Sequence, residues 1–525
     1  MLHLAAVLAV AYVCFWHGAT RFGLVGPDEP RYAAIARDMS ASNDWVTPRL
    51  HGEPWLEKPI LYYWVAAGGY LIFGDTERAA RLPSFLGAVG SLLGLLWLTT
   101  RFYDTNTTKL FALIFPSSLA GLVFARAATP DMLFSAALAL ALVAAAPLAL
   151  EPGLRRVRMY QVCFGAALGF AVLAKGPAGI VLAGGGSALG ALLTRRIRSV
   201  WRLAGPWAVG SFAVVALPWY VLCSIQNPEF VQIFLLSHNV DRFLTPVFQH
   251  AQPFWFFVPV MMLGLAPWTG IVVSALATVG QTGGRLSERW AGSPSVFLAG
   301  WALFPILFFS LSQSKLPGYV LPAIPAATLL LSVAAAHVTR AKRERWVGVG
   351  TTTVLAAMTL TFLVAPGVES SGVAPGAVRP LAFVLTAATI LTGYQTWRRR
   401  VHSVIAVSAL SVAATLLQLN TQVLPQIDPA ISTRTVANAV RRHTAGDPIR
   451  VFQLHRAWQY GLEYYLHKPL HAWSSTDPPG TVVVTTTRGM RQMQLDGAGI
   501  VVLGEISPQA LLVRTDPGGE KIVGY

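Results

Sequence analysis

Long apolar runs separated by short polar segments fill the first four fifths of the chain. The runs have about 15–23 residues, and nearly all are long enough for a helix to cross a hydrocarbon layer of ~30 Å. Such runs lie near residues 2–20, 82–100, 109–125, 131–150, 160–174, 176–194, 204–224, 254–276, 294–311, 319–338, 347–365, 380–397 and 402–420. The pattern predicts a polytopic α-helical membrane protein with about thirteen transmembrane helices.

The loop of about residues 21–81 interrupts this pattern. It holds two apolar stretches, Pro30–Met39 and Pro59–Phe73, that are too short to cross a bilayer. Each begins at a proline, which is favoured in the first turn of a helix. We therefore expect two interfacial helices in this first outer loop. A second long loop, about 225–253, is predicted on the same side of the membrane.

The chain changes character after the last apolar run. Helical patterns at Ile431–His443 and Trp458–Leu466 alternate with short β-branched runs. Those runs are Ile449–Leu454, Thr481–Thr487, Ile500–Leu503 and Leu511–Arg514. The sequence therefore predicts a transmembrane domain at 1–424 and a small α/β domain at 425–525.

Composition supports lipid as the main solvent. The 525 residues are 54% hydrophobic and only 12% charged, with a mean hydropathy of +0.53. A net charge of +16 would suggest nucleic acid in a soluble protein, but here the basic residues form short clusters between apolar runs. If the amino terminus is cytoplasmic, every cluster falls on the cytoplasmic side. The clusters are Arg155/Arg156/Arg158, Arg195/Arg196/Arg198/Arg202, Arg285/Arg289, Arg340/Lys342/Arg343/Arg345 and Arg398/Arg399/Arg400.

Two other features bear on the class of protein. The first twenty residues lack a basic leader and a small-residue cleavage site, so we interpret them as a retained first span. The three cysteines, Cys14, Cys163 and Cys223, all lie in apolar runs. We therefore expect the three cysteines to be small buried apolar side chains that form neither a disulfide framework nor a metal motif.

The outer loops hold the unusual polar residues. Asp28 and Glu29 are adjacent carboxylates just outside the first span, where charge is costly unless it is solvated or paired. Glu57 and Lys58 precede the second interfacial helix, and a lysine at head-group depth suits a lipid phosphate. A solvated turn before a helix is the alternative interpretation of the acidic pair.

Further polar residues are predicted on the same face. Asp131 begins the fourth span and Lys175 ends the fifth, while Tyr319 begins the tenth. In the second long loop, His238 and Arg242 share one side if that stretch is helical. Each residue alone is more often a snorkelling or capping residue, but their common side favours a functional cluster.

Together these residues resemble a known family. The resemblance rests on Asp28-Glu29-x-Arg31-Tyr32, Trp45, Glu57-Lys58-Pro59, Tyr63-Trp64, Pro130-Asp131, Lys175-Gly176-Pro177, Pro218-Trp219, Arg242-Phe243, Pro253-Phe254-Trp255 and Ser314-Lys315-Leu316-Pro317-x-Tyr319. In this order they are similar to bacterial 4-amino-4-deoxy-L-arabinose transferases of lipid A, which are grouped with protein O-mannosyltransferases in the GT-C class. The resemblance implies a GT-C fold in the bacterial inner membrane, with the active site and the carboxy-terminal domain on the periplasmic side.

The resemblance also implies roles for individual residues. The catalytic acids would be Asp28, Asp131 and Glu29. The carrier-lipid phosphate would be bound by Lys58, Lys175, Arg242 and Tyr319. Glu57 and His238 match positions that can hold zinc in one branch of the family, but two ligands do not complete a zinc site. No cofactor is therefore required, and a zinc ion at Glu57 and His238 stays open.

The implied reaction is transfer of a sugar from an undecaprenyl-type phosphate to an envelope glycolipid or glycan, most simply with inversion and an oxocarbenium-like transition state. A glycolipid transporter or flippase, a protein O-glycosyltransferase and a non-catalytic assembly protein are the alternatives. Membrane lipids, but no nucleic acid, are expected partners. The sugar, the acceptor and the oligomeric state stay open.

Overall fold

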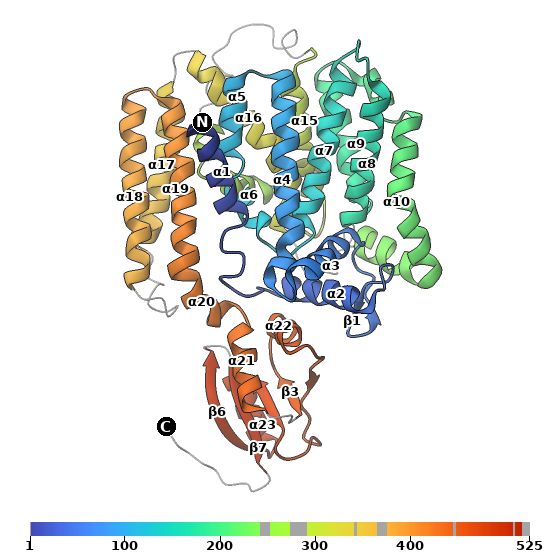
Figure 1. The fold of residues 1–525 in the computed structure, drawn as a ribbon, viewed down its shortest axis with the longest axis vertical. Helices are drawn as coiled ribbons and strands as arrows, with labels where there is room; N and C mark the ends of the chain where they lie inside the picture. Colours follow the sequence, from blue (N-terminus) through green and yellow to red (C-terminus); the bar gives the residue numbers. More distant parts are fainter. Residues whose placement is uncertain are drawn as a thin grey trace.

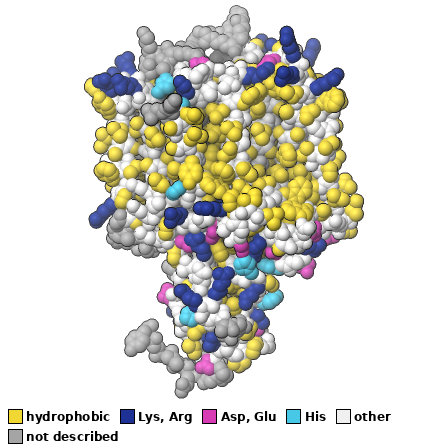
Figure 2. All heavy atoms as spheres, in the orientation of Figure 1, with side chains coloured by type: hydrophobic (Ala, Val, Ile, Leu, Met, Phe, Trp, Pro, Cys, Tyr) yellow, Lys and Arg dark blue, Asp and Glu magenta, His cyan; other side chains and the backbone are white. Residues whose placement is uncertain are grey.

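The protein consists of a helical bundle with a small α/β domain attached to one end (Figure 1). A computed structural model describes residues 2–241, 252–272, 291–340, 344–364, 375–444, 448–507 and 510–516. Apolar side chains cover the flank of the bundle as a broad belt, whereas the α/β domain carries a mixture of charged and apolar groups (Figure 2). A continuous apolar surface of this extent requires an apolar solvent, and the chain is a multi-pass membrane protein.

Helices overlap all thirteen predicted runs, the run near 254–276 being described only to residue 272. The bundle comprises α1 (Leu2–Phe15), α4 (Glu77–Phe102), α5 (Thr105–Ile114), α6 (Leu119–Ala125), α7 (Asp131–Leu150), α8 (Val157–Lys175), α9 (Ala178–Leu193), α10 (Pro206–Gln226), α12 (Phe257–Gly264), α15 (Pro294–Ser310), η3 (Pro317–Ala323), α16 (Ile324–Arg340), α17 (Glu344–Val364), α18 (Pro375–Trp397) and α19 (Val401–Gln418). By length and composition, eight spans among the described residues can cross a membrane, or nine if α5 and α6, bent by 58°, count as one.

Several helices are shorter than the apolar runs that predict them. Helix α1 has 14 residues, and turns follow it around Gly18, whose φ of +79° ends helical geometry. Helices α9 and α15 have 16 and 17 residues. The polytopic helical fold is confirmed, while apolar length alone overestimates how far these helices extend.

The first outer loop forms two short helices, α2 (Asp28–Ser42) and α3 (Leu61–Phe73), joined through a small hairpin of β1 (Arg49–Leu50) and β2 (Glu53–Pro54). Both helices lie across the end of the bundle, between it and the α/β domain (Figure 1). Helix α2 begins with two acidic residues at its positive end and stops at Asn43, which has left-handed backbone geometry. The 13 residues of α3 are too few to cross a bilayer.

The α/β domain follows η4 (Leu419–Val423) and α20 (Leu424–Ile431). Its strands β3 (Ile449–Phe452), β4 (His471–Ala472), β5 (Val482–Thr485), β6 (Gly499–Ser507) and β7 (Ala510–Asp516) form a mixed sheet in the order β4-β3-β5-β7-β6. Helices α21 (Arg434–His443), α22 (Arg456–Leu466) and α23 (Thr487–Leu495) accompany the sheet. The core packs Val440 and Leu462 from the helices against Val484 and Leu512 from the strands.

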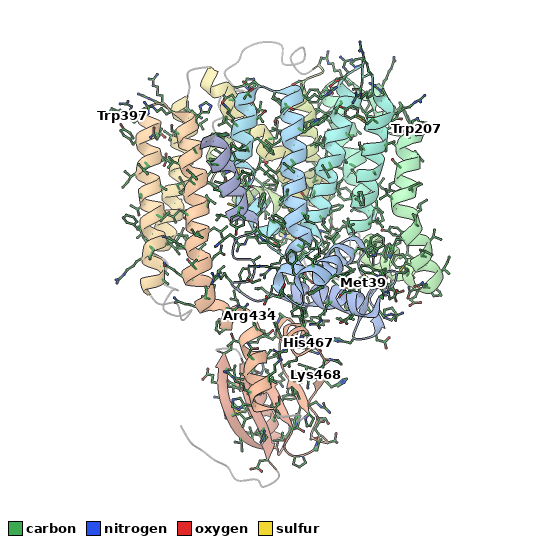
Figure 3. All side chains as sticks on the ribbon, in the orientation of Figure 1. Met39, Trp207, Trp397, Arg434, His467 and Lys468 are labelled. Carbon is green, nitrogen blue, oxygen red and sulfur yellow. The ribbon has the colours of Figure 1, made fainter. Side chains whose placement is uncertain are left out.

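Polar contacts fix the α/β domain against the first outer loop. Arg434 donates to Asp428 at 2.8 Å, to Glu77 at 3.3 Å and to the backbone carbonyl of Thr20 at 3.0 Å. The Tyr465 hydroxyl donates to Glu77 at 3.0 Å and accepts from the Leu24 N–H at 2.9 Å. The domain therefore has a defined position beside the loop that carries Asp28; Arg434 lies at this junction in Figure 3.

Basic side chains gather at the opposite end of the bundle from the α/β domain (Figure 2). Trp207 and Trp397, the latter directly before the cluster at residues 398–400, both lie at that end (Figure 3). Arg285, Arg289, Lys342 and Arg343 lie outside the described residues. The arrangement separates a basic end from the end that carries the outer loop and the α/β domain.

Candidate functional site

Three of the residues singled out by the sequence meet at the end of the bundle nearest the α/β domain. Lys175 Nζ donates to Asp131 Oδ1, and the Lys175 ammonium lies 5.4 Å from the centre of the Tyr319 ring and 5.6 Å from that of Phe134. The two charged side chains are only 20% and 22% exposed. A lysine, a carboxylate and a phenol from three distant segments therefore share one partly dry site.

Local backbone signals place these side chains. Helix α8 ends at Lys175 because Gly176 has a φ of +90° and Pro177 then starts α9. Asp131 is the first residue of α7, where the positive end of the helix favours a carboxylate. Gly318 on η3 lies next to this group, because a Cβ there would meet the Phe124 ring at 3.2 Å and Asp131 Oδ1 at an ordinary contact distance of 3.7 Å.

Asp28 begins α2, and both Asp28 and Asp131 are close enough to the buried Tyr32 to act on that side chain. Arg31 Nη2 donates to Asp28 Oδ1 at 2.5 Å, and the Asp28 side chain is 54% exposed while that of Arg31 is 11% exposed. The Arg31 guanidinium lies 5.0 Å from the ring centre of Trp55 and 5.6 Å from that of Tyr460, on α22. Asp28 is thus an accessible carboxylate that is oriented by its ion pair with Arg31. Aromatic rings surround the Arg31 guanidinium, and one of them comes from the α/β domain.

The charge on Arg31 is secured by its neighbours. Burial by itself lowers the pKa of the guanidinium, but neighbouring groups outweigh that effect and raise the pKa above its usual range. Those groups are Tyr32, Asp28 and Glu57. Arg31 therefore remains a fixed cation next to Asp28.

Glu29 occupies a different position from Asp28, although the two are adjacent in sequence. Its carboxylate accepts from Arg81 Nη2 at 3.0 Å, from the Ala128 N–H at 2.9 Å and from the Val25 N–H at 3.0 Å. Glu29 is 8% exposed and Arg81 only 1%. These contacts tie the first loop to α4 and to the turn before Asp131, so the geometry of Glu29 is that of a structural cross-link and does not support its predicted catalytic role.

Sequence reasoning did not single out Arg81. Besides Glu29, its guanidinium donates to the backbone carbonyls of Ala19, Phe22 and Gly23 at 2.5, 3.1 and 2.9 Å. The sequence did contain a signal for this ion pair, since an arginine at the start of an apolar span requires a partner. Which partner it would find could not be read from the sequence.

Glu57 and Lys58 lie half-buried in the bend before α3. The Lys58 ammonium is among the charges that act on the Asp131 carboxylate, and the Glu57 carboxylate acts on Arg31. Lys58 therefore lies near the pair of Lys175 and Asp131, and Glu57 lies near the pair of Arg31 and Asp28.

Two predicted residues are not fully described. Arg242 lies outside the described residues, and His238 is in the π-helix η2 (Val231–Asp241), its side chain lying outside the described part of the chain. The predicted zinc pair is thus represented by Glu57 alone. Within the described side chains, which do not include that of His238, no three His, Cys, Asp or Glu residues are grouped as a metal site requires.

Part of the chain is similar in sequence to known transferases. Residues 1–234 match the family model for dolichyl-phosphate-mannose-protein mannosyltransferase. An undecaprenyl phosphate-alpha-4-amino-4-deoxy-L-arabinose arabinosyl transferase of Yersinia enterocolitica is 32% identical over 308 residues, which are 58% of this chain and 54% of that protein. The protein of the same name from Pseudomonas aeruginosa is 33% identical over 62% of this chain and 58% of its own length. The matches thus span little more than half the length of these relatives.

The fold is similar over a greater length. The crystal structure of ArnT from Cupriavidus metallidurans bound to undecaprenyl phosphate aligns with a TM-score of 0.80 and 24% identity, covering 99% of this chain and 98% of that one. Its apo state aligns with a TM-score of 0.79 and 25% identity over 98% and 97% of the two chains. The chain is therefore a multi-pass membrane protein of the GT-C fold that resembles polyprenyl-phosphate glycosyltransferases in sequence and in architecture.

Proposed function

We propose that the chain is a glycosyltransferase that moves a sugar from an undecaprenyl-type phosphate to an envelope glycolipid of the lipid A kind or to another glycan. The observation that carries this proposal is the set of charged groups at one end of the apolar bundle. There Arg31 holds the accessible carboxylate Asp28, and Lys175 and Lys58, side chains suited to binding phosphate, act on Asp131. A lipid-linked substrate can reach such a site from the bilayer while its reacting head group lies in a polar environment.

The donor phosphate would bind on the lysine side of the site. Lys175 is partly buried between the rings of Tyr319 and Phe134, and the resemblance adds Lys58 and Arg242. When the bond between sugar and phosphate breaks, negative charge grows on the leaving oxygen. Ammonium groups already in place stabilise that charge without reorganising solvent, and one such donor is worth about 2.7–4 kcal/mol in the transition state.

Asp131 is the ion-pair partner of Lys175 when no donor is bound. In its present position the carboxylate neutralises the lysine, so the singly charged phosphodiester of the arriving donor would compete for the ammonium. We infer that Asp131 holds Lys175 in place before the donor binds and regains it after the product leaves. The Lys175 ammonium therefore has an anionic partner both before and after the donor binds.

The acceptor would bind on the Asp28 side. A hydroxyl acceptor requires a base, and an exposed carboxylate within reach of the acceptor can take its proton. A phosphate acceptor is already nucleophilic, in which case Asp28 orients the sugar or the acceptor. A single displacement of this kind inverts the anomeric centre, with an oxocarbenium-like transition state as in glycoside chemistry.

The basic end of the bundle supports a proposal for the orientation of the chain in the membrane. Under the positive-inside rule, the end with the arginine clusters faces the cytoplasm, together with the amino terminus. The catalytic site and the α/β domain then face the periplasm, and the membrane is the bacterial inner membrane.

Protein O-glycosylation is the second candidate, and the match of residues 1–234 to a protein mannosyltransferase family favours it. A glycolipid transporter is less well supported. Its binding charges are expected at the bilayer midplane between repeated halves, whereas Asp28, Glu57 and Lys58 lie in an outer loop at one end of the bundle.

The test is envelope mass spectrometry in a strain lacking the gene, restored with wild type, Asp28→Asn or Asp38→Asn. Asp38 lies on the same helix, so its substitution controls for expression and folding. We expect a fixed sugar-sized mass to return with wild type and Asp38→Asn but not with Asp28→Asn. Full restoration by Asp28→Asn would refute the catalytic assignment, and a modified protein in place of a glycolipid would identify the second candidate.

A further inference from the structure

An apolar groove lies on the lipid-facing flank between α8 and α10. It has a volume of about 440 Å³ and is lined by Val162, Pro206, Trp207, Gly210, Ser211 and Val214. The apolar side chains along it are exposed, Trp207 by 50% and Val214 by 75%. Within a bilayer, such a hollow is filled by hydrocarbon.

Close helix packing gives the groove its floor. A Cβ at Gly165 would lie only 2.0 Å from the Ala208 carbonyl oxygen, and one at Gly169 only 2.8 Å from the Val215 side chain, so α8 and α10 approach closely here. A Cβ at Gly210, in contrast, would meet no atom within 4 Å. Gly210 therefore leaves an open depression beside a tight helix contact.

The mouth of the groove is basic and aromatic. The Arg158 guanidinium lies 5.6 Å from the Trp207 ring centre, and Trp207 lies at the end of the bundle opposite the α/β domain (Figure 3). Arg155, Arg156 and Arg158 are exposed. None of these three forms an ion pair with the part of the chain that the structure describes, so their charge is available to an external anion.

We propose that this groove binds one acyl chain of an anionic phospholipid, whose head-group phosphate contacts Arg158 at the mouth. Basic pockets between spans and juxtamembrane clusters of arginines recognise acidic head groups. The apolar groove next to Arg158 would bind the acyl chain of the same lipid. Trp207 supplies the amphipathic ring expected at the depth where head group and chain meet.

This site is separate from the proposed donor site. Arg158 and Lys175 are near opposite ends of the same helix, and 17 residues at a rise of 1.5 Å place them about 26 Å apart along its axis. The lipid would thus occupy the basic leaflet, away from the reaction, and would fix α10 against α8 in that leaflet.

The experiment is native mass spectrometry of the purified full chain, titrated in parallel with phosphatidylglycerol and phosphatidylcholine. Wild type is expected to retain phosphatidylglycerol in preference. Arg158→Gln should weaken retention about fivefold, corresponding to the ~1 kcal/mol of one arginine near an anionic surface. Gly210→Leu should abolish it by filling the groove, and the open space at this position lets the variant fold.

Arg398→Gln is the matched control, because Arg398 follows Trp397 at the same end of the bundle and neither residue lines the groove. It should behave as wild type. Equal retention of both lipids by wild type, an equal loss in all three variants, or retention unchanged by Gly210→Leu would each overturn the proposal. Melting temperatures of the variants, measured without added lipid, show that differences in retention do not reflect misfolding.

Discussion

Replacing Glu29 by glutamine separates a structural carboxylate from a catalytic one. The substitution keeps the size of the side chain but removes its charge, so the buried Arg81 loses its ion-pair partner while it keeps the carbonyls of Ala19, Phe22 and Gly23. The new amide also cannot satisfy all three donors, because Ala128 N–H and Arg81 bind different oxygens of Glu29.

The magnitude follows from these contacts. Breaking one partner of a buried ion pair costs about 3–5 kcal/mol, and the three remaining carbonyl contacts of Arg81 place the cost near the lower end, at about 3 kcal/mol. A loss of ~1 kcal/mol lowers Tm by about 2–4 °C in a domain of 150–250 residues, and by less in a longer chain. We therefore expect Glu29→Gln to lower the melting temperature by several degrees.

The assay is thermal unfolding of the purified protein in lipid nanodiscs, followed by tryptophan fluorescence, together with turnover measured well below the transition. Glu53→Gln, at an exposed position in the same loop, is the control and should leave the melting temperature unchanged. The structural interpretation requires a lower melting temperature for Glu29→Gln with turnover retained in the folded fraction. An unchanged melting temperature with turnover reduced a hundredfold would refute it and restore Glu29 as a catalytic residue.

Three further predictions address the site and the α/β domain. Lys175→Met should lower kcat about 10²–10³-fold, the effect of removing one preorganised donor, while Lys175→Arg retains part of the rate; single-turnover sugar transfer measures both. Tyr460→Leu removes one aromatic face from Arg31 and should lower turnover about two- to fivefold, as expected for a cation–π contact of ~0.5–1 kcal/mol, whereas Tyr460→Phe should match wild type. Burial, with help from nearby arginines, lowers the pKa of His467, so the unfolded state takes up its proton first as pH falls through about 6.5. Stability should therefore decline on acidification through that range, and His467→Asn should make thermal unfolding less dependent on pH there.

The sequence predicted the membrane fold because lipid imposes a local requirement. A helix that crosses a bilayer must be apolar along its whole length, so runs such as 131–150 or 402–420 can be recognised without knowing their neighbours. The α/β domain was also readable, since Ile449–Phe452 and Val482–Thr485 carry the β-branched residues that fit a buried strand. The order of the predicted spans then put Asp28, Lys58, Asp131, Lys175 and Tyr319 on one side of the membrane, because each pair of crossings returns the chain to the same side.

Only the tertiary structure decided which of these residues touch. Asp28 and Glu29 are adjacent in sequence, but successive residues on a helix point about 100° apart. One carboxylate therefore faces the site and the other enters the contact with Arg81. Likewise, Lys175 meets Asp131 from 44 residues away, and Tyr460 reaches Arg31 from another domain. Hydropathy fixes the face on which a residue lies, whereas helix rotation and domain docking set its contacts, and these depend on packing between segments far apart in the chain.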